Sequence, residues 1–295
     1  MPGGCWAGAA RAAVATFGAG VQYLKQKELL KTRLQLCELE DLPWFPQAIR
    51  EGMQDFLRFM ITRLNTYEPA LPQLQQLLEH TQQRHITDLC SGAGGGIAPL
   101  RQELSKRIGA SVQVTLTDLY PNVEAYEYLR KGSSGTISFI PEPVDCTAVP
   151  ASMRGVRTIF SSFHHFPPPV AKAILQDAVD KRAAIGVFEG AKKSWGEMLL
   201  LWLLFPVVIL LVTPFIRPFK LSRLFFTYII PLIPLGIIWD GTVSLLRIYP
   251  PKLLERMVEQ LQAPHYTWQT GRTGSGLGKH VIYLIGYPTA QGTSS

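Results

Sequence analysis

The sequence predicts an α/β protein with a largely parallel sheet, and three observations carry that prediction. From Ile86 onward, short apolar runs alternate with helical patterns, as in sheets whose parallel strands are joined by covering helices. The first of these runs leads into a segment with four glycines, residues 92–96, and a helical pattern follows it at once. Two further runs, 265–274 and 280–288, flank a glycine-rich turn and predict a closing antiparallel pair.

Residues 1–80 are expected to form an N-terminal arm and a helical cover in front of this sheet. The arm, 1–20, is rich in alanine and glycine, and Arg11 makes it a poor secretory signal, so we interpret it as mobile or touching a membrane. A loose amphipathic pattern predicts a helix from residue 21 to the prolines of segment 43–46. Two more helices are predicted at 47–65, which has a wide apolar stripe, and at 72–80.

The strands and helices that follow are assigned to a core of residues 81–197, completed by 240–295. The first strand contains Ile86–Leu89, and the helix after it runs from Ile97 to Ile108, because apolar residues there recur at spacings of three and four. Later strands are predicted at 112–119, 135–145, 155–166 and 183–191, with a helix at 168–181 between the last two.

An unusually apolar stretch, residues 198–239, separates the two parts of the core. Residues 198–216 carry no charge, and as one helix they would be about 28 Å long, just enough for a hydrocarbon core of about 30 Å. Residues 224–239 are also uncharged but short for that task. Four prolines interrupt the helical hydrogen bonding, namely Pro206, Pro214, Pro231 and Pro234.

We expect this stretch to form a helical hairpin that dips into one leaflet of a bilayer. Its connecting segment carries Arg217, Lys220 and Arg223, which would lie at the lipid headgroups. If both segments spanned the bilayer, these cations would lie opposite the rest of the chain, against the positive-inside tendency. The alternatives are true spanning, and a helical pair buried in the domain or in a dimer interface.

Composition narrows the choice of partners only in part. The chain is 47% hydrophobic and 17% charged, which is apolar for a soluble enzyme. Its net charge of +7 suits both nucleic acid and anionic lipid, but the basic residues are spread along the chain, so we expect no nucleic acid. The four cysteines form no CxxC motif or Cys/His cluster; we therefore expect reduced thiols, no disulfide framework and no metal site.

The glycine segment has the pattern of a nucleotide pocket, in which a strand, a glycine loop and a helix N-terminus face the ligand. A glycine-rich turn without a ligand is the simpler alternative. Asp118 favours a ligand, because it ends the second strand, 26 residues after Gly92, where a carboxylate accepts hydrogen bonds from the two ribose hydroxyls of an adenosine. NAD has the same ribose, but the loop lacks the GxGxxG spacing of NAD-binding proteins.

The segment DLCSGAGG followed by Asp118 resembles the first two motifs of the class I S-adenosylmethionine-dependent methyltransferases, and the resemblance covers residues 84–190 and the closing strands. It implies a Rossmann-like seven-stranded sheet with S-adenosyl-L-methionine as cofactor. Cys90 stands where the family usually has glycine. Asp145 matches a position that often bonds the adenine amino group, with a solvated turn as the alternative. The cofactor-binding residues implied are Asp88, Cys90, Ser91, Gly92, Gly94, Asp118, Leu119, Asp145, Cys146 and Ser161.

Four residues are candidates for catalysis. The segment SSFHHF resembles the family's fourth strand end, where His165 or His164 would accept a proton from the methyl acceptor or hydrogen-bond to it. The alternative is that both histidines only shape the loop. Asp240 and Arg247 lie seven residues apart, on one face of a helix where the hairpin re-enters the domain. They would hold a polar headgroup, or pair with each other and fix the hairpin.

These patterns together predict methyl transfer to a lipid-like or hydrophobic acceptor at a membrane surface. The expected partners are a lipid bilayer and a hydrophobic small molecule or lipid substrate, with the active domain on the cytoplasmic side. Two other functions stay open. One is a non-catalytic S-adenosylmethionine-binding module of a membrane assembly, and the other is a methyltransferase with an RNA or protein acceptor.

Overall fold

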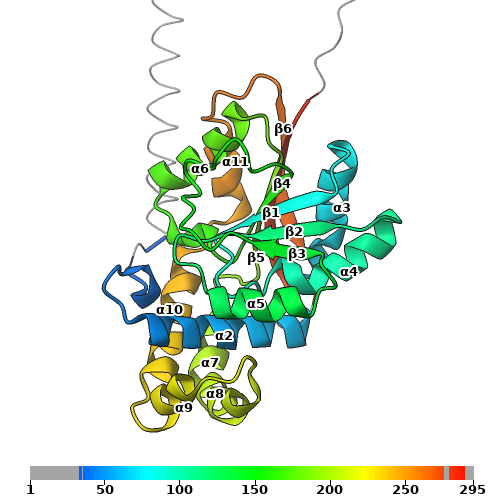
Figure 1. Ribbon diagram of the computed structural model, residues 1–295. Coiled ribbons are helices and arrows are strands. Elements are labelled where there is room, and N and C mark those ends of the chain that lie inside the picture. The colour runs from blue at the N-terminus through cyan, green and yellow to red at the C-terminus, as the bar shows by residue number, and fades with distance from the viewer. Residues whose placement is uncertain (1–32, 35, 276–278, 290–295) are drawn as a thin grey trace, which may run out of the picture.

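A computed structural model describes residues 33–34, 36–275 and 279–289 of the chain. The predicted arm, 1–20, and most of the helix predicted from residue 21 lie outside these residues. Within them the chain forms a seven-stranded sheet in the order β3-β2-β1-β4-β5-β7-β6 (Figure 1). The strands are β1 (His85–Leu89), β2 (Gln113–Leu116), β3 (Ile137–Phe139), β4 (Val156–Phe160), β5 (Ile185–Glu189), β6 (Tyr266–Thr273) and β7 (Val281–Pro288).

β1 lies at the centre of the parallel part of the sheet. It pairs with β2, where Asp88 is opposite Leu116, and with β4, where Leu89 is opposite Ile159. β3 and β5 extend the parallel ladders outward, while β7 runs antiparallel to both β5 and β6. The first five strands therefore end at one edge, where ligands bind in open α/β sheets. The predicted parallel sheet with a closing antiparallel pair is confirmed.

The predicted runs 112–119, 135–145, 155–166 and 183–191 are all longer than the strands they contain, and for two of them the reason lies in the local backbone. The run 135–145 contributes only Ile137–Phe139, because Pro141 and Pro143 follow and proline cannot donate to a ladder. The run 155–166 ends as a strand at Phe160, because the next residue, Ser161, has φ +45°.

Helices cover both faces of the sheet. Alternate residues of β5 face different layers, with Phe188 on the side of α3 and α4, and Val187 on the side of α6 and α11. The helix α5 packs along β3 at the edge of the sheet, and Asn122 caps its first turn. These helices are α3 (Leu71–His80), α4 (Ile97–Ile108), α5 (Val123–Lys131), α6 (Pro168–Asp180) and α11 (Pro251–Val258).

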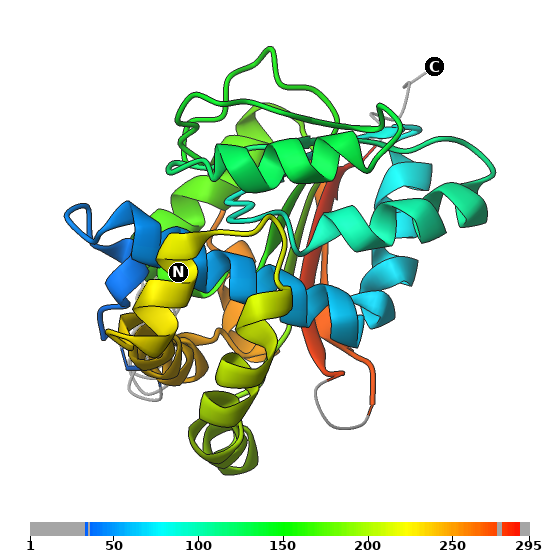
Figure 2. The ribbon, with the colours of Figure 1, turned by 60° about the horizontal axis from the view of Figure 1, so that its bottom comes forward.

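The helix α2 (Gln47–Leu64) runs past the carboxyl ends of the strands (Figure 2). The residues before it, 33–34 and 36–42, form what we call the N-terminal strap. Its regular structure within the described residues is a 3₁₀ turn, Leu39–Asp41. The predicted helix is therefore wrong here, because the backbone N–H groups of residues 39 and 40 donate to the carboxylate of Asp240 instead of to helical carbonyls.

The apolar stretch forms short helices instead of two long segments, and we call residues 195–239 the apolar hairpin. Prolines set the breaks, since Pro206 and Pro214 lie in the first turns of helical elements and Pro231 precedes the last helix. None of the described helices is long and apolar enough to cross a bilayer alone; two pairs of helices, bent by 46° and 78°, meet the criterion together by length and composition only. The helices are α7 (Trp195–Leu203), α8 (Phe205–Val212), α9 (Leu221–Tyr228) and α10 (Leu232–Arg247).

Buried ion pairs and a small apolar core fix the apolar hairpin to α2. Asp55 of α2 is fully buried and accepts a hydrogen bond of 2.7 Å from Arg223, and Lys220 lies 2.9 Å from Glu51. The prediction that Lys220 and Arg223 lie at lipid headgroups is therefore wrong, because the α2 carboxylates hold both cations inside; Arg217 is exposed. The core between the two elements comprises Ile49, Met53, Phe56, Ile209, Ile216, Ile233 and Ile237.

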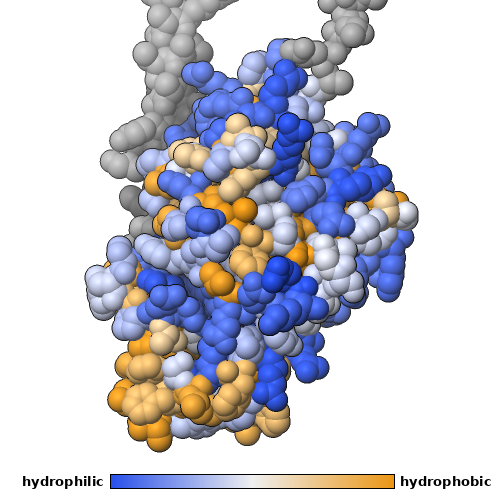
Figure 3. All heavy atoms as spheres, in the orientation of Figure 1, coloured by the Kyte–Doolittle hydropathy of each residue, from blue (hydrophilic) through white to orange (hydrophobic). Residues whose placement is uncertain are grey.

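The outer side of the apolar hairpin exposes large apolar side chains. Figure 3 shows them gathered at the end of the molecule formed by α7, α8 and α9. Trp195 is 86% exposed, Leu221 75% and Phe215 71%, which is unusual for side chains of this kind. The others above 55% exposure are Leu199, Trp202, Leu203, Leu211, Ile229 and Leu235.

Candidate active site

The loop after β1 approaches its neighbours too closely for side chains. A Cβ on Gly96 would lie 2.4 Å from the Phe160 side chain, and one on Gly95 would lie 2.8 Å from the Cα of Arg58. Gly94 has φ +78°, and a Cβ there would lie 2.5 Å from a leucine of α5. These glycines let the loop pack between α2, β4 and α5.

Gly92 differs from them because a Cβ there would meet no atom at less than van der Waals distance. Its φ is +54°, and the nearest atom to a Cβ there would be 3.8 Å away, in the Gln54 side chain. The Gly92 N–H donates to Oδ2 of Asp118 at 2.8 Å, and the Tyr120 N–H donates to Oδ1 at 2.8 Å. Burial raises the pKa of Asp118, and these backbone hydrogen bonds oppose the shift. Each carboxylate oxygen has two lone pairs, so each can accept one further hydrogen bond from a ligand.

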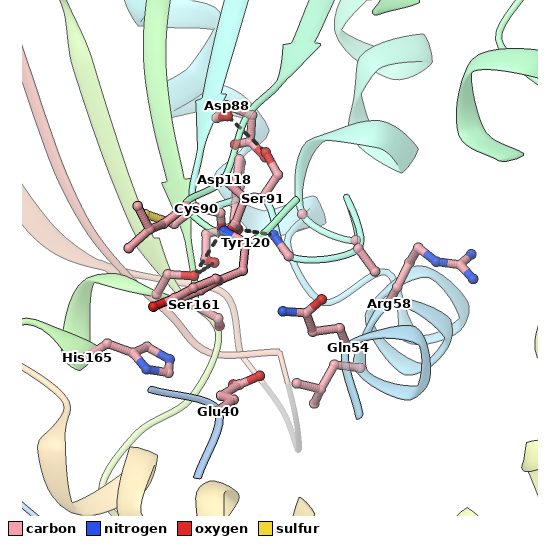
Figure 4. Close-up of a pocket in the computed structure, with 18 of the residues that line it drawn as sticks. Glu40, Gln54, Arg58, Asp88, Cys90, Ser91, Asp118, Tyr120, Ser161 and His165 are labelled. Atoms are coloured by element: carbon pink, nitrogen blue, oxygen red, sulfur yellow. Dashed lines mark hydrogen bonds between the residues drawn. The ribbon is translucent and has the colours of Figure 1, made fainter. Parts of the chain in front are cut away.

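A cavity of about 410 Å³ opens beside Gly92, within the usual size range of small-molecule sites. Figure 4 shows Asp88, Ser91 and Asp118 at its upper end, and Glu40 and His165 at its lower end. The structure thus brings together residues that are far apart in the sequence. The predicted site residues on its wall are Asp88, Cys90, Ser91, Gly92, Asp118, Leu119, Ser161 and His165.

Two of these wall residues have unusual environments. Asp88 is 1% exposed and accepts a hydrogen bond of 2.6 Å from the Thr158 hydroxyl. Burial raises the pKa of Asp88 to about 7, although hydrogen bonds from Thr158 and Ser91 oppose the rise. Cys90 has φ +54°, in the left-handed region that favours glycine. Glycine, which the resemblance leads one to expect at this position, would adopt this backbone conformation without strain.

Our reading of the sequence missed the polar side of α2. Arg50, Gln54 and Arg58 recur at a spacing of four, which places them on one helix face, and all three line the cavity. That spacing, beside the apolar stripe, is the signal that would have found them. Oε1 of Gln54 is buried without a hydrogen-bond partner in the described part of the chain, so it offers an acceptor to a polar ligand. Glu40 was also missed; burial, opposed by His165, raises the pKa of Glu40 to about 8.

Three residues predicted to bind the cofactor are not on the cavity wall. Gly94 packs against α5 as described above. Asp145 is exposed, and its Oδ1 accepts hydrogen bonds from the N–H and hydroxyl of Thr147 at 2.8 and 2.7 Å. Asp145 therefore stabilises a solvated turn, and the predicted adenine contact is corrected. Cys146 is 5% exposed and lies in the apolar core with Leu89.

Carboxylates hold both candidate histidines. His164 is 4% exposed and off the cavity wall; its Nδ1 lies 2.8 Å from Glu189, whose other oxygen accepts the His164 backbone N–H at 2.9 Å. His165 is on the wall, with its Nδ1 2.7 Å from Asp41. Burial lowers the pKa of His165, but Glu38 and Asp41 outweigh it and raise the pKa to about 10. The raised pKa favours the imidazolium form, so of the two predicted roles of His165 the arrangement favours a hydrogen bond to the methyl acceptor over acceptance of its proton.

The other two catalytic candidates are buried in α10 and hold the N-terminal strap. Asp240 accepts hydrogen bonds from the backbone of residues 39 and 40, at 2.7 and 3.1 Å. Arg247 donates to Glu38 at 3.0 Å and to Asp41 at 2.7 Å. Asp240 and Arg247 are seven residues apart, which is about 10 Å along a helix, so they are too far apart to form the ion pair that is the other prediction. Since both side chains are engaged with the strap and off the cavity wall, their assignment as headgroup ligands is corrected as well.

Comparisons with known proteins give matches among solved structures. No protein-family model and no curated protein sequence matches the chain. The plantazolicin methyltransferase BpumL in complex with SAH is 12% identical, with a TM-score of 0.52 over 90% of this chain and 98% of that one. An O-methyltransferase family protein from Burkholderia thailandensis is 14% identical (TM-score 0.43, 80% of this chain and 59% of that one). Human N-acetylserotonin methyltransferase is 13% identical (TM-score 0.46, 81% and 57%).

The chain spans less than two thirds of the length of the Burkholderia and human proteins, but nearly all of the plantazolicin methyltransferase. At 12% identity that last similarity concerns the fold. It agrees with the observed strand order, in which β1 is central and β7 is the antiparallel strand between β5 and β6. The protein therefore has a Rossmann-like methyltransferase fold.

Proposed function

We propose that the protein transfers a methyl group from S-adenosyl-L-methionine to a lipid-like or otherwise hydrophobic acceptor at a membrane surface. The observation that carries the cofactor assignment is the pairing of Gly92 with Asp118 on the cavity wall. The cofactor supplies the sulfonium methyl group. Alignment of the acceptor within about 3 Å of that methyl is then the main task of this chain.

The residues present fit such a cofactor. Gly92 leaves a hollow that a Cβ would fill, beside a carboxylate that can accept two ribose hydroxyls. The Gln54 side chain lies 3.8 to 4.0 Å from the place where a Cβ on Gly92 would be, and its buried, unpaired Oε1 suits a donor such as an ammonium group. These groups support S-adenosyl-L-methionine in the upper part of the cavity, which leaves the lower part, near Glu40, for the acceptor.

Calorimetry with the full-length protein tests the cofactor site. Asp118→Ala removes two charge-assisted hydrogen bonds of about 1.5 to 3 kcal/mol each, so we expect affinity for S-adenosyl-L-methionine to fall at least about 100-fold. Asp145→Ala is the matched control, because this carboxylate is exposed and off the cavity wall. Equal affinity of Asp118→Ala and the unmodified protein would exclude the assignment.

The apolar hairpin supports the choice of acceptor. Its exposed side chains match the hydrocarbon region of a lipid leaflet better than water. Its last helix, α10, packs against both α2 and the N-terminal strap, and these two elements line the lower part of the cavity. An acceptor drawn from a bilayer would therefore reach the site over a short route. Membrane association with the active domain on the cytoplasmic side is part of this proposal.

Flotation with phospholipid vesicles tests the attachment. We expect the unmodified protein to float, and a variant with glutamate at Leu203, Leu211 and Phe215 to stay behind, because charges in a leaflet are costly. Flotation of that variant to the same extent would refute a role of the hairpin. The matched control carries glutamate at exposed apolar positions elsewhere, Leu34, Leu64 and Val123.

Transfer of label from S-adenosyl-L-methionine into a membrane extract tests the reaction itself. Label in an extractable hydrophobic molecule supports the proposal. Label only in protein or RNA would point to another acceptor, and binding without any transfer would point to a non-catalytic module.

A further inference from the structure

Two imidazoles face one buried carboxylate at the lower end of the cavity. Nδ1 of His164 lies 2.8 Å from Glu189, and Nδ1 of His165 lies 2.7 Å from Asp41. A carboxylate at Nδ1 keeps a proton on that nitrogen and leaves Nε2 as the nitrogen that can bind a metal ion, after loss of its proton where it carries one. The two Nε2 atoms lie 3.7 and 3.4 Å from the two oxygens of Glu38. Three potential ligand atoms thus meet in one place.

This arrangement leaves one buried nitrogen without a partner in the described part of the chain. Glu38 is 1% exposed and His164 is 4% exposed. Nε2 of His164 has no hydrogen-bond partner within the described residues, and 3.7 Å is too long for a hydrogen bond to Glu38. An orphaned buried polar atom costs about 1 to 3 kcal/mol. A cation between the three groups would satisfy all of them at once.

We infer that Glu38, His164 and His165 bind a divalent first-row transition metal ion of the Zn²⁺ type. One ligand atom from each residue lies within 4.8 Å of the others. Two ligands about 2.0 to 2.1 Å from a tetrahedral Zn²⁺ are about 3.4 Å apart, which agrees with the 3.4 Å between Nε2 of His165 and Oε2 of Glu38. Nε2 of His164 lies 3.7 Å from the other oxygen, Oε1. Two imidazoles and one carboxylate suit such ions better than Mg²⁺ or Ca²⁺, which prefer oxygen. Glu189 and Asp41 would hold the imidazoles from behind.

The local charge also suits a divalent cation. Three carboxylates, those of Glu38, Asp41 and Glu189, contact the two imidazoles. The guanidinium of Arg247 donates to two of them, and that of Arg33 lies close to Glu189 and Glu38. Three carboxylates against two guanidinium groups leave one negative charge for an added cation once His165 has lost its proton. One oxygen of Glu38 accepts a hydrogen bond of 3.0 Å from Arg247, and the other accepts one of 3.1 Å from Ser244. Each oxygen has a second lone pair, which is available to a metal ion.

The ion would lie beside the part of the cavity that we assign to the acceptor, because His165 and Asp41 are on the cavity wall. Metal binding would displace any proton on Nε2 of His165 and therefore release it. The site itself does not depend on the proposed methyl transfer. Direct metal binding can therefore fail or succeed independently of cofactor binding.

Titration of the chelator-treated, full-length protein with Zn²⁺ tests the site, with the visible absorption of Co²⁺ as a second readout. We expect one equivalent of tight binding. Glu38→Gln and His164→Gln should each weaken it more than about 100-fold, because each removes a ligand. Asp41→Asn should weaken it about 10- to 100-fold, because it removes only the carboxylate behind His165.

His265→Gln is the matched control, since His265 is exposed and outside the cluster. It should bind Zn²⁺ as tightly as the unmodified protein. Asp41 is 31% exposed, so its variant keeps the test usable if the buried variants fail to fold. Absence of stoichiometric Zn²⁺ and Co²⁺ binding would overturn the inference. Unchanged affinity in Asp41→Asn and in every folded variant of Glu38 or His164 would do the same.

Discussion

Asp88→Asn should stabilise the protein, and more so at high pH than at low pH. The ordinary pKa of an aspartate is 3.8, and burial raises that of Asp88 to about 7. At a pH between these two values, Asp88 is ionised in the unfolded chain but protonated in the folded chain. The folded state therefore loses stability as the pH rises from about 4 to 7, and the loss stays constant above that. Its total is about 4 kcal/mol, of which about 3 kcal/mol develops between pH 5 and pH 8.

Asparagine has no such titration, and its Oδ1 can still accept the hydrogen bond from Thr158. The assay is urea unfolding of both proteins at pH 5, 6, 7 and 8, because groups common to both cancel in the difference. We expect the advantage of Asp88→Asn to grow by about 3 kcal/mol across this range. A difference that does not change with pH would refute the reasoning. Thr158→Val should steepen the dependence, since it removes a donor that stabilises the ionised form.

Two further predictions concern α2. Asp55→Ala should lower the free energy of unfolding in urea by about 3 to 5 kcal/mol, because it leaves the buried Arg223 without its carboxylate. The control, Glu103→Ala, breaks an exposed ion pair and should lower it by less than about 1 kcal/mol. Equal losses would contradict the role of the buried pair. Gly95→Ala should lower thermal stability by about 1 to 3 kcal/mol, because its Cβ would lie 2.8 Å from an α2 backbone atom. Gly132→Ala, whose nearest atom is 3.7 Å away, should be nearly neutral, and a similar loss in both would argue against the close approach.

The parts of the fold and site that the sequence predicts correctly are those that local physics determines. The glycine loop and Asp118 belong to this class, because a strand end, a tight turn and a carboxylate at the next strand end occur in a fixed order. The spacing of apolar residues predicted α4 for the same reason. These features need no knowledge of distant partners.

The errors arise where a distant partner decides the outcome. The strap is not helical, because Asp240, about 200 residues away, takes its backbone donors. Lys220 and Arg223 are not at a headgroup surface, because Asp55 is buried against them. The pKa of His165 is raised, because Glu38 and Asp41 of the strap lie beside it. No pattern within a short window of sequence contains these contacts.

The position of the apolar hairpin in the chain has a consequence for biosynthesis. One edge of β5 pairs with β7, and residue 187 is opposite residue 284, so the whole hairpin lies between the two partners in the sequence. During synthesis the hairpin therefore leaves the ribosome while β5 still has an open edge. Its apolar helices must find α2 or a lipid surface before the sheet is complete. The order of translation thus exposes the most apolar part of the chain before the sheet is complete, and makes the time until β7 emerges the interval most prone to aggregation.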